Sequence, residues 1–242
     1  MEDFTAAIQA NQRRAWLLVA AVAVPVALVV GLICLAVNLV VAVVVFLVLL
    51  VAVGGAIWGT ADGRAASALG GQVADEHDHA RLINLVDGLC AGAGVSPPRL
   101  VVVQSNGLNA LAMGLDPKRA TLAVTSGLLN LLSVIELEGV LAEELVRIKR
   151  RDTAPGTVAA GLGPLRRLAA GSAATEERTD ISAVTITRYP PGLASALEKL
   201  EEGGTRVPAG PARLGDLWLA DPTGSATSRA PLTDRVAALR EL

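Results

Sequence analysis

One stretch of the chain, residues 139–152, holds acidic and basic side chains at spacings that matter for chemistry. It reads GVLAEELVRIKRRD, and apolar residues from Val134 to Ile148 recur at steps of three and four, which predicts a helix with one apolar face. On that helix Glu143 and Arg147 lie one turn apart on the same side, with Glu144 next to them. Carboxylates offer oxygen ligands to a hard cation, whereas a guanidinium stays protonated and has no acceptor atom. The pattern therefore predicts an ion pair more readily than a metal site.

A second cluster, Asp75-Glu76-His77-Asp78-His79, contains the only two histidines of the chain. If these consecutive residues are helical, His77 and His79 point about 200° apart and cannot share one ion. We interpret the cluster as the solvated start of an amphipathic helix over residues 82–93.

The N-terminal quarter of the chain is strongly apolar. No charged side chain occurs from Ala15 to Ala61, and one membrane span needs about 20 apolar residues, so this run predicts two spans, at residues 16–36 and 39–58. The run is far longer than the apolar core of a signal peptide, about 7–15 residues. Arg13-Arg14 precede the first span and the turn near Asn38 is uncharged, which predicts that both ends of the hairpin face the cytoplasm.

These features divide the chain into four expected parts. They are a cytoplasmic segment (1–14), a transmembrane hairpin (15–59), a linker (60–74) and a cytoplasmic domain (75–242). β-rich runs at 99–103 and 121–125 predict an α+β fold, in which a mainly helical domain contains a small antiparallel sheet. Residues 154–171 are too short and too rich in glycine and proline to span a bilayer, so we expect a mobile or surface-lying connection there.

Composition excludes some partners and favours others. The net charge is −2 and no basic run is interleaved with aromatic residues, so nothing favours nucleic acid. Cys34 lies in the apolar run, so we expect no disulfide with Cys90. The expected partners are the lipid bilayer of the cell's inner (plasma) membrane and other membrane proteins. Gly55 and Gly59 form a GxxxG pattern through which the hairpin could self-associate.

The stretch at 139–152 resembles the active-site helix of the HtpX-like membrane zinc peptidases, whose pattern is roughly GVLAHELAHIxxRD. In that pattern two histidines one turn apart bind Zn²⁺, and the glutamate between them is the general base. The resemblance sets Glu143 and Arg147 at the two histidine positions and Glu144 at the general-base position. It implies a zincin-like fold whose zinc is lost.

Other segments resemble the same family in the same order. EERTD at 176–180 resembles ExxAD, which implies that Glu176 stands at the third ligand position and Asp180 supports it. RAPLTDRVAALREL at 229–242 resembles HPPxxxRIxxLxxL, with Arg229 in place of a histidine and Arg235 kept, which implies that both arginines line the vestigial cleft. The family also has an edge strand with the pattern NAFAxG, which pairs with the substrate backbone. The resemblance implies that role for Asn109, Ala110, Leu111, Ala112, Met113 and Gly114. From the residues alone, the same segment is predicted only as one strand of a hairpin.

The departures from the family pattern fall at its chemical positions, so the resemblance implies a pseudopeptidase that binds, scaffolds or regulates partners in membrane protein quality control. One alternative is an active metal-dependent endopeptidase in which Glu143, Glu144, Glu176 and Asp180 bind Mg²⁺, Ca²⁺ or Mn²⁺. Another is a structural subunit of a larger membrane complex.

The same match predicts what replaces the metal. The carboxylates that converge on one cleft would repel each other without a cation. We expect the Arg147 guanidinium to bridge Glu143 or Glu144 to Glu176, with Arg229 as a second positive charge. The alternative is that Arg147 pairs with Glu143 along its own helix.

Overall fold

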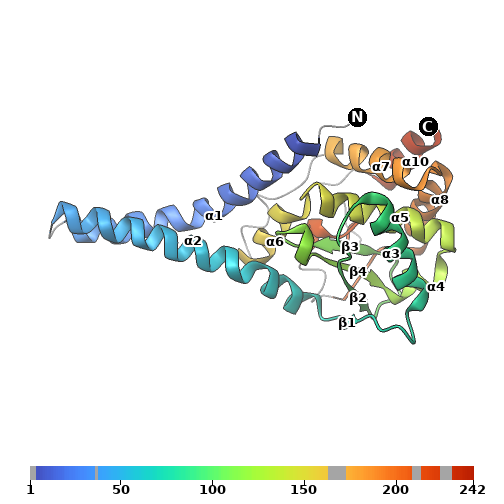
Figure 1. The fold of residues 1–242 in the computed structure, drawn as a ribbon, viewed down its shortest axis with the longest axis horizontal. Coiled ribbons are helices and arrows are strands. Elements are labelled where there is room, and N and C mark those ends of the chain that lie inside the picture. Colours follow the sequence, from blue (N-terminus) through green and yellow to red (C-terminus); the bar gives the residue numbers. More distant parts are fainter. Residues whose placement is uncertain (1–3, 36–37, 163–172, 209–213, 224–230) are drawn as a thin grey trace.

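The computed structural model describes the chain apart from residues 1–3, 36–37, 163–172, 209–213 and 224–230, and apart from the side chains of residues 173–178 and Asp216. Two long helices project from a rounded domain (Figure 1). The elements, in chain order, are α1 (Phe4–Leu35), α2 (Leu39–Leu69), β1 (Gln72–Val73), α3 (Ala80–Ala93), β2 (Arg99–Val103), β3 (Ala110–Met113), η1 (Pro117–Arg119), β4 (Thr121–Thr125), α4 (Ser126–Leu131), α5 (Val134–Lys149), α6 (Thr153–Leu162), α7 (Ala173–Thr187), α8 (Pro190–Gly203), η3 (Gly215–Leu217) and α10 (Leu232–Arg240).

The two projecting helices form the expected hairpin. Both are long and apolar enough to cross a membrane, and Asn38 caps α2 by accepting a hydrogen bond from the Val40 amide. Trp16 of α1 and Trp58 of α2 stack with their ring centroids 4.3 Å apart. The stacking puts both side chains at one level of the hairpin, as expected for aromatic residues at one membrane surface.

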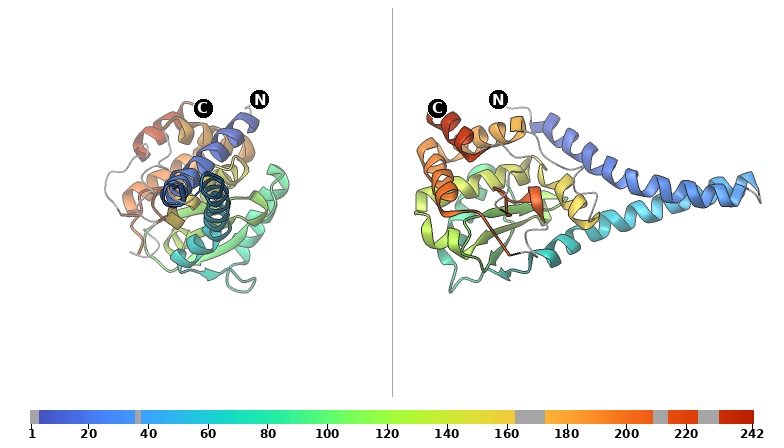
Figure 2. Two further views of the ribbon diagram at one scale, coloured as in Figure 1. Left: turned by 90° about the vertical axis from the view of Figure 1, so that its left-hand side faces the viewer. Right: turned by 180° about the vertical axis from the view of Figure 1, so that it is seen from behind.

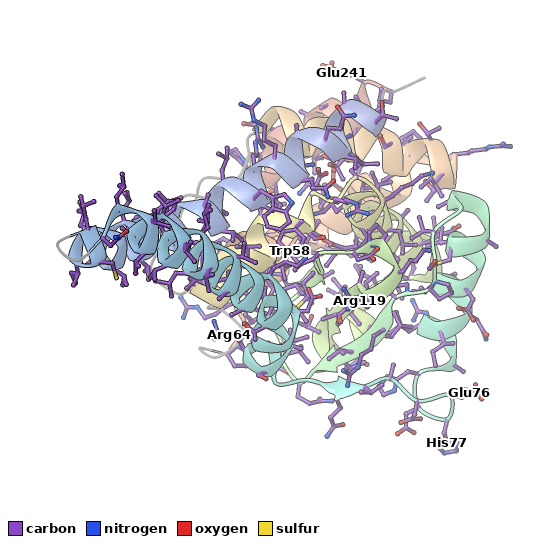
Figure 3. All side chains as sticks on the ribbon, turned by 60° about the vertical axis from the view of Figure 1, so that its left-hand side comes forward. Trp58, Arg64, Glu76, His77, Arg119 and Glu241 are labelled. Atoms are coloured by element: carbon purple, nitrogen blue, oxygen red, sulfur yellow. The ribbon has the colours of Figure 1, made fainter. Side chains whose placement is uncertain are left out.

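The expected linker at residues 60–74 is instead helical as far as Leu69, because α2 continues beyond the apolar run. Ala61, Ala65 and Leu69 recur every fourth residue, and each is buried against the domain. This apolar face stabilises the extension, which ends at Gly70 in the left-handed conformation. Figure 3 shows Trp58 and Arg64 on this part of α2, where the hairpin meets the domain.

The sheet has the strand order β1-β2-β4-β3 and is mixed, whereas an antiparallel sheet was expected. β3 pairs antiparallel with β4, but β2 pairs parallel with β4, with Val101 opposite Ala123. The chain reverses after β2 and again after β3, so β4 runs in the direction of β2 and takes the position between the two. The remainder of the fold class is confirmed: a mainly helical domain with a small sheet follows two apolar helices.

Helix α5 lies at the centre of the domain. Its first turn is closed by a capping box between Ser133 and Glu136, and the Glu136 carboxylate also accepts hydrogen bonds from Ser195 and Lys199 of α8. Burial raises the pKa of Glu136, but these hydrogen bonds outweigh burial and lower it to about 2. The apolar side of α5 packs against α3, α8 and the sheet through fully buried residues: Leu137, Leu141, Leu145 and Ile148.

Residues 154–171 were expected to be a mobile or surface-lying connection, but their first part belongs to the buried helix α6. Figure 2 shows α6 between the diverging ends of α1 and α2. Ala154, Val158 and Ala159 pack against buried residues of both hairpin helices. Burial on both sides explains the helix, because small apolar residues allow close packing. The remaining residues, 163–171, lie outside the described residues.

The hairpin also contacts the end of α5 directly. The side-chain amide of Asn11 in α1 donates hydrogen bonds to the Arg150 carbonyl and to the Asp152 carboxylate. On the α2 side, the Leu115 amide donates to Asp62 over 3.1 Å. The hairpin is therefore joined to the domain by polar contacts as well as by its apolar face.

Candidate functional site

The three residues that define the candidate site lie in the middle of α5 and are buried. Glu143 is 1%, Glu144 0% and Arg147 6% exposed. Around them lie α7, α10 and the segment at residues 217–220. Charged groups at this depth are stable only when they are paired and hydrogen-bonded. Their partners therefore decide what the site can do.

Arg147 pairs with Glu144, three residues before it. Its Nη1 donates to both carboxylate oxygens of Glu144, over 2.8 and 2.9 Å, and to the Leu217 carbonyl oxygen over 2.9 Å. Burial lowers the pKa of Arg147, but the nearby carboxylates of Glu144 and Glu143 outweigh burial and raise it. Arg147 thus lies inside the cleft, as expected. The alternative in which it pairs with Glu143 along the helix is wrong, and the bridge to Glu176 stays a prediction because that side chain lies outside the described residues.

Arg235 of α10 is the second positive charge. Its Nε and Nη2 donate to the two carboxylate oxygens of Asp180 over 2.9 and 2.5 Å, and Nη2 also donates to Glu143 Oε1 over 2.7 Å. The two-pronged contact fixes the orientation of the carboxylate as well as neutralising it. The sequence reasoning assigned the second charge to Arg229, which lies outside the described residues. The sequence reasoning also placed Arg235 in this cleft through the family resemblance, but it did not predict the pairing of Arg235 with Asp180 and Glu143.

The described site has one more carboxyl group than guanidinium groups. Glu143, Glu144 and Asp180 face Arg147 and Arg235. Burial raises the pKa of Glu143 to about 8. The positive charge of Arg235 lowers this pKa, whereas the negative charge of Asp180 raises it further. A proton on Glu143 would remove the excess negative charge. Within the part of the chain that the structure describes, Glu143 Oε2 has no hydrogen-bond partner.

This set of side chains does not fit a zinc ion. Zinc in proteins takes about four nitrogen, sulfur or oxygen ligands, whereas Arg147, which the resemblance sets at a ligand position, cannot coordinate a cation. Both oxygens of Glu144 accept hydrogen bonds from Arg147, and Glu143 Oε1 accepts one from Arg235. Among the described residues, no three His, Cys, Asp or Glu side chains are placed to hold one metal ion.

The segment expected as a peptide-binding strand forms the edge strand β3. The residues from Asn109 to Met113 are at most 2% exposed, because residues 217–220 of the same chain lie along the outer edge. The sequence reasoning did not assign the apolar stretch LWLA at residues 217–220. The available signal was a short apolar run between Gly215-Asp216 and Asp221-Pro222, which is typical of a buried extended segment.

The other sequence candidates lie away from this site. Asp75 caps the turn before α3 by accepting hydrogen bonds from the amides of His77 and Asp78. This agrees with a solvated helix start. Cys34 and Cys90 are both free thiols.

Comparison with known proteins adds two findings. The sequence model of peptidase family M48 matches residues 76–199, slightly more than half of the chain. The chain is 28% identical over 290 aligned residues to a Protease HtpX homolog of Dictyoglomus thermophilum, covering 99% of this chain and 96% of that protein. It is 29% identical to one of Acidiphilium cryptum (77% and 82% covered), and 44% identical over 99 residues to one of Thermococcus kodakarensis (40% and 34% covered).

Proposed function

The chain belongs to peptidase family M48, and on that premise we propose that it is a membrane-anchored, catalytically inactive HtpX-like protein that binds, scaffolds or regulates other membrane proteins. The family is one of zinc metallopeptidases. In this proposal the chain keeps the fold of the family but binds no zinc.

The observation that carries the proposal is the pairing of the buried carboxylates with two guanidinium groups. Peptide hydrolysis by a zincin needs a carboxylate that can take a proton from a water molecule. At the general-base position both oxygens of Glu144 accept hydrogen bonds from Arg147. At the first ligand position Glu143 accepts from Arg235, which also binds Asp180. The groups that would do the chemistry are thus paired with guanidinium groups instead.

A second candidate function is a peptidase that uses an oxygen-liganded cation such as Mg²⁺, Ca²⁺ or Mn²⁺. The buried Glu143 Oε2, which lacks a hydrogen-bond partner among the described residues, is the observation in its favour. Such a cation needs six or more oxygen ligands or bound waters. Arg147 and Arg235 would repel it, so this candidate ranks second.

A third candidate function is a structural subunit of a larger membrane complex. Purifying the chain from native membranes and identifying the proteins that come with it would distinguish this function.

Metal analysis tests the proposed function. We expect the full chain, purified in detergent without chelator, to carry well under one zinc ion per chain and to leave an unfolded substrate protein uncleaved. The double variant Glu143→His with Arg147→His restores the two nitrogen ligands one turn apart, and we expect it to bind zinc more tightly than the parent. The single variant Glu143→His is the matched control, because Arg147 still blocks its site. One tightly held metal ion per parent chain would contradict the proposal.

We further propose that both ends of the hairpin and the domain lie in the cytoplasm, because Arg13-Arg14 flank α1 and the turn at Asn38 is uncharged. The test uses a Cys34→Ala, Cys90→Ala background carrying either Asn38→Cys at the turn or Ser67→Cys near the domain. The cells keep an intact inner membrane, and their outer envelope is made permeable to the reagent. A thiol reagent that cannot cross the inner membrane is then expected to label only the Asn38→Cys variant. Labelling of the Ser67→Cys variant alone would contradict this topology.

A further inference from the structure

Residues 217–220, here called the inner segment, begin at the last residue of η3 and lie along the outer edge of β3. Trp218 forms an antiparallel bridge with Leu111, and the Leu219 amide donates to the Ala110 carbonyl over 2.7 Å. β3 is an edge strand of the sheet, so its outward amides and carbonyls would otherwise be open for pairing with another chain.

Asn109 fixes the inner segment to the strand. Its Nδ2 donates to the carbonyls of Ala220 and Thr205 over 2.9 and 3.0 Å, and its Oδ1 accepts from the amides of Ala220 and Ala110 over 3.1 and 3.0 Å. The side chain is 0% exposed, and its two donors and two lone pairs are all used. Asn109 therefore binds main-chain groups as a side chain does when it holds an extended peptide ligand. Here the main-chain groups belong to the same chain.

The side chains of the inner segment alternate as those of a strand do. Trp218 is 0% exposed and packs on one side of the sheet with Leu111, Met113 and Leu69. Leu219, also 0% exposed, belongs to the core on the other side. The Leu217 carbonyl accepts a hydrogen bond from Arg147. The inner segment thus joins the edge strand to the charged residues of α5.

Main-chain hydrogen bonds to a sheet edge, with pockets for alternate side chains, are how an edge strand binds an extended peptide. We propose that the inner segment is an internal peptide ligand, which fills the groove beside β3 and closes it to peptides from outside. A peptide that replaces it must be extended, with an aromatic side chain at the position of Trp218 and an apolar one at that of Leu219. This inference rests on the backbone pairing and holds whether or not the charged site binds a metal.

A peptide-binding experiment on the full chain in detergent tests the inference. The probe is a fluorescent peptide with the sequence GDLWLAD, and its matched control is GDLWPAD, which lacks the amide equivalent to that of Leu219. We expect both peptides to bind the parent chain only weakly, because the inner segment already occupies the edge of β3. The variant Leu219→Pro removes the hydrogen bond to Ala110, so we expect it to bind GDLWLAD about ten-fold more tightly than the parent and more tightly than GDLWPAD.

Hydrogen exchange provides a second measurement that needs no variant. If the inner segment fills the groove, the parent's Leu219 and Ala220 amides exchange slowly, together with those of β3. Fast exchange at both amides would overturn the proposal even if Leu219→Pro failed to fold. Binding of GDLWLAD to the parent as tightly as to the variant would also overturn it, because the groove would then be open.

Discussion

Replacing Arg235 by alanine is expected to lower the free energy of unfolding by about 3–5 kcal/mol, because the buried Asp180 carboxylate would lose its cation and Glu143 would lose its hydrogen-bond donor. Arg235 is 4% exposed and bonds both oxygens of Asp180 as well as Glu143. Denaturant unfolding of the detergent-solubilised chain, followed by tryptophan fluorescence in a Trp16→Phe, Trp58→Phe background that leaves the buried Trp218, measures the change.

Arg240 gives a matched control on the same helix. It pairs with Glu198 at the surface, with 67% of its side chain exposed, and such pairs contribute about 0–1 kcal/mol. Arg240→Ala should therefore unfold almost as the parent does. Adding Glu143→Gln and Asp180→Asn to Arg235→Ala should recover part of the loss, since no uncompensated charge remains. Equal effects of Arg235→Ala and Arg240→Ala would contradict a buried network.

Local patterns in the sequence were sufficient to predict the helices but not all of their bounds. The steps of three and four between Val134 and Ile148 predicted α5, and the uncharged run from Ala15 predicted the hairpin. The extension of α2 to Leu69 was missed because residues 60–69 include Gly63 and several small polar side chains, while the apolar face of Ala61, Ala65 and Leu69 becomes evident only when it packs against the domain. The parallel pairing of β2 with β4 was missed for a related reason. Strand order depends on contacts between distant segments, which a local pattern does not contain.

The members of the candidate site were predicted better than their pairing. Glu143, Glu144, Arg147 and Asp180 were assigned to one cleft through the family resemblance, and the structure brings all four together. The choice of Glu144 over Glu143 as the partner of Arg147 depends on side-chain rotamers. The roles of Arg235 and Leu217 depend on segments 92 and 70 residues away from their partners. Spacing along one helix could not show either.

Replacing Arg147 by alanine is the second change with a large expected effect, about 3–5 kcal/mol in the free energy of unfolding. Glu144 is 0% exposed and would lose hydrogen bonds of 2.8 and 2.9 Å to its two oxygens, which would leave a buried charge without this cation. The same variant removes the donor to the Leu217 carbonyl. We therefore expect faster hydrogen exchange at Leu219 as well as lower stability.

A double variant separates the charge from the packing. Glu144→Leu with Arg147→Met replaces the ion pair by apolar side chains of similar size, and replacing a buried pair in this way is often neutral or stabilising. It should recover most of the stability that Arg147→Ala loses, less the cost of the unpaired Leu217 carbonyl, about 1–3 kcal/mol. If Arg147→Ala instead melted like the parent, Glu144 would not depend on Arg147 for its charge. The general-base position would then be free to take up a proton or a cation, and the peptidase reading would gain over the inactive one.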